Sequence, residues 1–159
     1  MKHRWQNSLL TAAPIAFAIW FFYMAYLGLT WLETGENVAS VDWLPARATN
    51  VSFYRSYGST AYEFDIPEKD FVAWSDWDVA EIVEPVSMMR YSYFAEPSPH
   101  LSVNATTEEE VVAHEKAISE RYATIADGLY YGHLRSNGGG VWVAYDRRTG
   151  RAFFRSAPR

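Results

Sequence analysis

The sequence contains no cysteine, which excludes a disulfide bond and any thiolate chemistry. Because a bacterial envelope and a cytosol both accommodate a cysteine-free protein, this absence does not decide the compartment. No two histidines have the spacing of a helical zinc site, and no Asp-x-Asp-x-Asp-Gly loop of the calcium-binding type occurs. We therefore assign no catalytic, cofactor-binding or metal-binding residue from the sequence.

Charge is unevenly distributed along the 159 residues, whose net charge is −5. Residues 33–115 carry sixteen Asp or Glu against four Lys or Arg, whereas residues 116–159 carry three against eight. An acidic chain with no recognised binding motif argues against a nucleic-acid partner. With 49% hydrophobic residues, the chain is expected to fold rather than to be disordered as a whole.

A long stretch near the N-terminus has no charge, since no Asp, Glu, Lys or Arg lies between Trp5 and Leu32. The strongly apolar part of this stretch would form a helix of roughly 36 Å, enough to cross a hydrocarbon core of about 30 Å. Trp5 lies at one end, and Tyr26 and Trp31 lie at the other, where aromatic side chains anchor a helix to the membrane interface. The sequence therefore predicts a transmembrane helix over 8–32.

The flanking charges predict an orientation for this helix. Lys2 and Arg4 precede it, whereas Glu33 and Glu36 follow it. The positive-inside rule then places the N-terminus in the cytoplasm and the rest of the chain outside, in a single-pass protein of the inner cell membrane. The alternative is a cleaved signal peptide: its apolar core is normally shorter, at about 7–15 residues, but the small residues of 38–40 suit a signal peptidase.

Small residues also recur four apart in the apolar stretch, at Ser8, Ala12 and Ala16. Such a stripe lets two helices approach closely and is a candidate helix-packing surface.

The whole chain is expected to consist of a cytoplasmic stub (1–7), the transmembrane helix (8–32), a linker (33–46) and an extracytoplasmic α+β domain (47–159).

Alternating apolar and polar residues predict strands in this domain. They cover residues 50–56, 60–66, 129–135, 140–146 and 151–156. The turn sequence at 57–59 predicts an antiparallel hairpin from the first two strands, and glycine-containing turns predict a meander from the last three. In the second strand, Tyr62 and Phe64 are expected on the buried face, with Glu63 and Asp65 on the opposite face.

Two helices are predicted beside the sheet. Pro67 opens a short one that turns Phe71 and Trp74 to the core. The second covers about 108–126 and begins with a capping box formed by Thr107 and Glu110. Its apolar stripe is expected to comprise Val111, Ile118, Tyr122 and Ile125, and Gly128 to end the helix. The predicted fold is therefore α+β, with a mostly antiparallel sheet and two helices packed on one face.

Arginines dominate the C-terminal part of the chain and form the candidate contact surface. These are Arg147, Arg148, Arg151, Arg155 and Arg159. Positions 151, 155 and 159 share a face if the last strand continues, because side chains repeat every second residue. The arginines would contact carboxylates of a partner or anionic lipid head groups; the alternative is that they pair with the acidic surface of their own domain.

Several C-terminal motifs carry a resemblance. They are Asn137-Gly138-Gly139-Gly140, Tyr145-Asp146 and Gly150-Arg151-Ala152-Phe153, together with a Leu44-Pro45-x-x-Ala48 opening. In these motifs the chain resembles small uncharacterised membrane-anchored proteins of planctomycete-type bacteria. The resemblance covers 44–66 and 127–159. It implies a domain boundary and nothing about activity.

Two functions are compatible with this sequence. The first is a non-enzymatic, membrane-anchored extracytoplasmic interaction module, with the lipid bilayer and another membrane or envelope protein as its partners; an accessory subunit of a membrane complex is one such role. The alternative is a small envelope enzyme or ligand-binding domain. Its pocket would lie between helix and sheet, near Asp127, Tyr130 and His133.

Overall fold

The computed structural model describes residues 17–24, 26, 30–96 and 107–157. The chain divides into two compact units, residues 1–32 and residues 33–159. In the first unit, residues 17–24 form a continuous described helix.

Among the described residues, no helix has the length and apolar character needed to cross a membrane. The predicted fold, which includes a transmembrane helix over 8–32, is contradicted on this point. Of the predicted membrane-interface and helix-packing residues, Trp5, Ser8, Ala12 and Ala16 lie outside the described residues. Tyr26 and Trp31 are both exposed.

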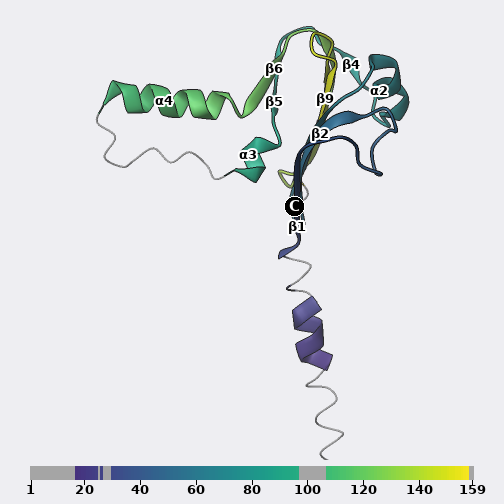
Figure 1. Ribbon diagram of the computed structural model, residues 1–159, viewed down its shortest axis with the longest axis vertical. Coiled ribbons are helices and arrows are strands. Elements are labelled where there is room, and N and C mark those ends of the chain that lie inside the picture. The colour runs from purple at the N-terminus through teal and green to yellow at the C-terminus, as the bar shows by residue number, and fades with distance from the viewer. Residues whose placement is uncertain (1–16, 25, 27–29, 97–106, 158–159) are drawn as a thin grey trace, which may run out of the picture. The chain divides into compact units, whose positions relative to one another are not determined.

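The second unit is built on a seven-stranded sheet (Figure 1). In spatial order its strands are β1 (Leu32–Val38), β2 (Thr49–Ser56), β3 (Thr60–Asp65), β9 (Arg151–Ala157), β8 (Gly140–Asp146), β7 (Gly128–Leu134) and β4 (Ala80–Glu81). The predicted hairpin is confirmed as β2 and β3, and the predicted meander as β7, β8 and β9. Strand β1 lies in the stretch that the sequence indicates as a linker.

One face of the sheet carries the larger core. Phe53, Phe64 and Tyr145 pack there with Phe71 of helix α2 (Glu68–Trp74). Phe71 is fully buried and stacks on Tyr145 with 5.0 Å between ring centroids. The Tyr145 hydroxyl donates a hydrogen bond of 3.0 Å to the Ile66 carbonyl, which ties β8 to the end of β3. Helix α2 therefore packs as the sequence predicts.

The opposite face is covered by a two-stranded sheet of β5 (Val86–Met89) and β6 (Tyr122–Ile125). Met88 and Ile125 from these strands form a second core with Ala144 and Phe153 of the main sheet. Each of these four residues is buried. The main sheet is thus covered on both faces, and polar residues on its second face are enclosed with the apolar ones.

Residues 90–121 are inserted between β5 and β6, and we call this insertion the arm. It contains helices α3 (Ser92–Ala95) and α4 (Glu108–Ser119). The strands that flank it pair antiparallel, so Met89 lies opposite Tyr122. At the base of the arm the Arg90 amide donates a 2.9 Å hydrogen bond to the Arg121 carbonyl. The two ends of the arm therefore leave the domain side by side.

Helix α4 differs from the predicted second helix. Its start is confirmed, because the Glu110 amide donates to the Thr107 hydroxyl at 3.3 Å. However, the helix ends at Ser119, and none of its side chains is buried. The prediction of two helices packed on one face is therefore wrong.

The end of the predicted helix is instead strand β6. Tyr122 and Ile125 are three apart, a spacing that suits one helical face but places them on opposite faces of a strand. Pairing with β5 decides between the two, and Ile125 is buried as a strand residue. Gly128, expected to end a helix, begins β7.

Candidate functional site

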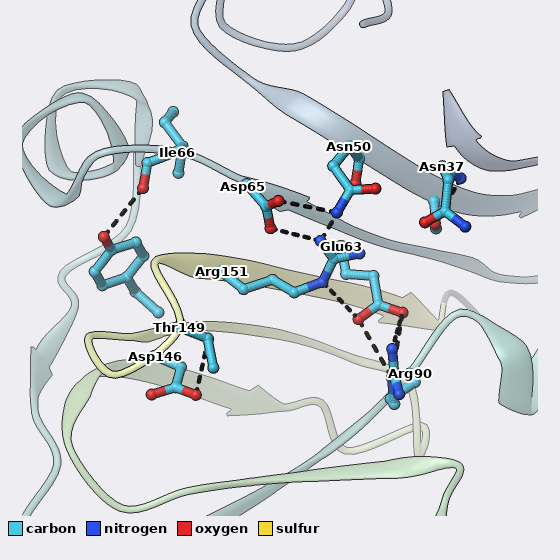
Figure 2. A network of polar contacts seen from close by, with 11 residues as sticks. Asn37, Asn50, Glu63, Asp65, Ile66, Arg90, Asp146, Thr149 and Arg151 are labelled. Carbon is cyan, nitrogen blue, oxygen red and sulfur yellow. Dashed lines mark hydrogen bonds and ion pairs between the residues drawn. The ribbon is translucent and has the colours of Figure 1, made fainter. Parts of the chain in front are cut away.

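The polar centre of the domain is Glu63 on β3 (Figure 2). Its side chain is 1% exposed and accepts hydrogen bonds from Arg90 at 3.3 Å and from Arg151 at 3.1 Å. A buried carboxylate is costly unless it is paired and hydrogen-bonded, and two guanidinium groups meet that need here. Sequence reasoning missed this role, because it placed Glu63 on the polar, outward face of its strand.

Arg151, a predicted contact residue, is held inside the domain by further partners. Its Nη1 lies 2.6 Å from a carboxylate oxygen of Asp65 and donates to the Asn50 carbonyl at 3.3 Å. Asn50 in turn donates from its side-chain amide to Asp65 at 2.9 Å. Figure 2 shows this chain of contacts running from β2 through β3 to β9.

Arg147 is also paired with carboxylates of its own domain. It lies 2.8 Å from Glu68, 2.6 Å from Glu81 and 3.3 Å from Asp127. Hydrogen bonds to Glu81 and Glu68 raise the pKa of the Arg147 guanidinium, and the bond from Arg147 lowers the pKa of Glu81. Arg147 thus joins α2, β4 and the start of β7 to the turn after β8.

The other predicted contact residues have different surroundings. Arg148 is exposed, and its backbone amide donates to Asp146 at 2.9 Å in the β8–β9 turn. Arg159 lies outside the described residues. Arg155 of β9 lies opposite Trp142 of β8, with its guanidinium carbon 4.4 Å from the Trp142 ring centroid and 5.7 Å from that of Phe94.

Arg155 is half-buried and has no ion pair with a carboxylate among the described residues. Its Nε is buried and has no hydrogen-bond partner among the described residues. Burial lowers the pKa of its guanidinium, while the nearby phenols of Tyr93 and Tyr122 act in the opposite direction. Arg151 and Arg155 share a face of β9, yet the first contacts carboxylates and the second contacts aromatic rings.

A cavity of about 310 Å³ lies at the base of the arm. It is lined by Glu36, Arg90, Tyr91, Ser92, Glu96, Ala117, Glu120 and Arg121. Burial and a hydrogen bond to Glu36 raise the pKa of Tyr91 to about 12. Arg121 is buried, and its guanidinium lies 3.7 Å from the Glu96 carboxylate. These residues carry no motif by which the sequence could have marked them.

The residues of the predicted enzyme-like cluster do not share a site. Asp127 is held by Arg147, and His133 is exposed on β7. Tyr130 lines a cavity of about 390 Å³ that is formed with residues 80–84 and Val86. In the part of the chain that the structure describes, no group of three or more His, Asp or Glu is placed to hold a metal ion.

Comparisons with protein-family models, curated proteins and solved structures find no match to this chain. The resemblance to proteins of planctomycete-type bacteria therefore stays a prediction.

Proposed function

We propose that this domain is an interaction module that binds a partner protein through helix α4 of the arm. The observation that supports the proposal is that none of the side chains of α4 is buried, although the helix carries apolar residues. Val111 is 38% exposed and Ile118 is 39% exposed. They are two turns apart and lie on one face of the helix.

The length of α4 supports the same conclusion. It has 12 residues, and isolated helices shorter than about 12–15 residues are marginal in water, because most helical stability in proteins comes from packing an apolar face. The Thr107 cap contributes about 1 kcal/mol, which does not replace such packing. Contact with a partner would bury Val111 and Ile118 and so supply the missing packing of the apolar face.

The charge of α4 indicates the chemistry of the partner. The helix has four glutamates against a single lysine: Glu108, Glu109, Glu110, Glu115 and Lys116. An acidic amphipathic helix binds best in an apolar groove whose rim is basic, because complementary charge increases the association rate and orients the helix. We therefore expect a partner protein with a basic-rimmed apolar groove.

Hydrogen bonds and ring packing fix the base of the arm, from which α4 extends, to the rest of the domain. Arg90 is bonded to the buried Glu63, and its amide is bonded to Arg121. Arg121 in turn donates to the Glu96 carbonyl at 3.4 Å. Phe94 of α3 stacks on Tyr54 of β2 with 5.6 Å between ring centroids, so α3 packs against the main sheet.

Photo-crosslinking tests the proposal. A photoreactive amino acid at Val111 or Ile118, introduced in cells that make the protein, is expected to form an adduct with a specific protein. The same residue at the exposed Arg148 is the matched control and is expected to form none. The change Val111→Asp should abolish the Ile118 adduct. Equal labelling from 111, 118 and 148 would contradict a specific interface on α4.

Stability measurements provide the second test. Val111→Asp and Ile118→Asp should leave the melting temperature of the isolated protein almost unchanged, because surface substitutions usually change stability by less than about 0.5 kcal/mol. A large fall would show that α4 packs on its own domain, and the proposal would be wrong.

A further inference from the structure

We propose that Arg155, with Tyr93 and Tyr122, forms a binding site for a small organic carboxylate that has an apolar or aromatic body. This inference is independent of the partner of α4. It rests on a half-buried guanidinium that lies between two aromatic rings and has no carboxylate partner among the described residues.

The groups that the strand pairing and the ring contacts place against Arg155 are neutral. On the neighbouring strands, Ala61 of β3 and Trp142 of β8 lie directly opposite it. The arm contributes Phe94 and Tyr93, and β6 contributes Tyr122. A partly desolvated cation in such surroundings is stabilised by an anion that reaches it.

The other paired arginines of the same region contact carboxylates, whereas Arg155 contacts aromatic rings. Arg147 has three carboxylates within 3.3 Å, and Arg151 has two within 3.1 Å. Arg155 has two aromatic rings in their place. Stacking orients the planar guanidinium and leaves its edge to donate hydrogen bonds, which is the geometry for a bidentate contact with a carboxylate.

The two tyrosines add a second donor. The Tyr122 and Tyr93 hydroxyls are hydrogen-bonded to each other, and the ring centroids are 5.7 Å apart. Tyr93 is 37% exposed, so its hydroxyl is accessible to a ligand. A carboxylate at Arg155 would therefore accept from the guanidinium and from Tyr93.

The walls of the site indicate the rest of the ligand. Trp142 and Phe94 flank the guanidinium, and Tyr54 stacks on Phe94. An aromatic or apolar group attached to the carboxylate would bury surface against these rings, whereas a small hydrophilic anion would not. Benzoate is therefore expected to bind more tightly than acetate or inorganic phosphate.

Nuclear magnetic resonance of the full chain tests the site without mutation. On titration with benzoate, the Arg155 Nε–Hε signal should shift saturably in the millimolar range, the affinity expected of so small a ligand. Acetate should require a higher concentration, and phosphate should produce no saturable shift. The signal of the exposed Arg148 is the internal control. Equal, unsaturated shifts of Arg148 and Arg155 would overturn the proposal.

Variants test the individual donors, with the Trp142 indole signal as the readout. Arg155→Gln should weaken benzoate binding at least tenfold, Arg155→Lys should weaken it because Lys lacks the planar fork, and Tyr93→Phe should weaken it a few-fold. Arg148→Gln should bind as the wild type does. Undiminished binding by Arg155→Gln would overturn the proposal, even if α4 proves to bind a partner.

Discussion

The Nε of Arg151 lies 3.1 Å from a carboxylate oxygen of Glu63, although the two residues are 88 positions apart in the sequence. Glu63 is 1% exposed, and the side chain of Arg151 is 14% exposed. The contact joins the predicted hairpin to the predicted meander through the β3–β9 pair. Arg151, which the sequence predicts to contact a partner, therefore pairs with a carboxylate of its own domain.

Replacing Glu63 should destabilise the domain strongly. Glu63→Gln leaves Arg90 and Arg151 without their shared carboxylate, and breaking a buried ion pair costs about 3–5 kcal/mol. Glu33→Gln is the matched control, because Glu33 is 44% exposed and pairs with Arg55 at 3.1 Å. An exposed pair contributes about 0–1 kcal/mol. Urea unfolding should therefore separate the two variants, and equal midpoints would contradict the role of Glu63.

The two longer helices of the second unit should respond differently to truncation. Phe71→Ala on α2 removes a fully buried ring and should lower the free energy of unfolding by about 3–5 kcal/mol. Val111→Ala on α4 should change it by less than about 0.5 kcal/mol, because this side chain is 38% exposed. Thermal unfolding of the isolated protein measures both. A similar loss for both would mean that α4 packs on the sheet after all.

High pH should destabilise the fold through its tyrosines. The pKa of Tyr91 is raised to about 12, and burial raises the pKa values of Tyr62 and Tyr145. An unfolded tyrosine has a pKa of about 10, so the unfolded state loses its proton first as the pH rises. The stability contribution is complete below about pH 10 and is lost between about pH 10 and 12.

Tyr91→Phe checks this pH dependence, because phenylalanine cannot ionise. Its free energy of unfolding should fall less than that of the wild type between about pH 9 and about pH 11. Tyr57→Phe, at an exposed position on the β2–β3 turn, is the control and should follow the wild type. If Tyr91→Phe loses as much stability as the wild type, Tyr91 is not the group responsible.

The part of the fold that could be predicted depends on local signals. The β2–β3 hairpin and the β7–β9 meander follow from alternation and from turn residues a few positions apart. Strand β1 was missed, since its residues show no alternation and it pairs with a strand more than ten residues away. The helix predicted over 108–126 was too long, because its last residues form strand β6. That strand exists only by pairing with β5, which lies on the other side of the arm in the sequence.

The candidate site was less predictable than the fold. Glu63 alternates with apolar residues and therefore matches an outward position. Only the cover that β5 and the arm provide makes that position buried. Likewise, nothing within β9 distinguishes Arg151 from Arg155, because their partners lie on other elements. Arg151 pairs with Asp65 of β3, whereas Arg155 contacts Phe94 of α3.

Gly128 begins β7 with a φ of +151°, a backbone conformation that favours glycine. A side chain there would be strained, and its Cβ would collide with the carbonyl oxygen of Tyr145. Gly128→Ala should therefore cost more than 1 kcal/mol of unfolding free energy, since an alanine that does not suit its backbone destabilises by more than about 0.4–1 kcal/mol. Gly58→Ala is the matched control, because nothing lies within 4 Å of a Cβ at that position. Urea unfolding should show a lower midpoint for Gly128→Ala alone, and a wild-type midpoint would show that β7 can begin without this glycine.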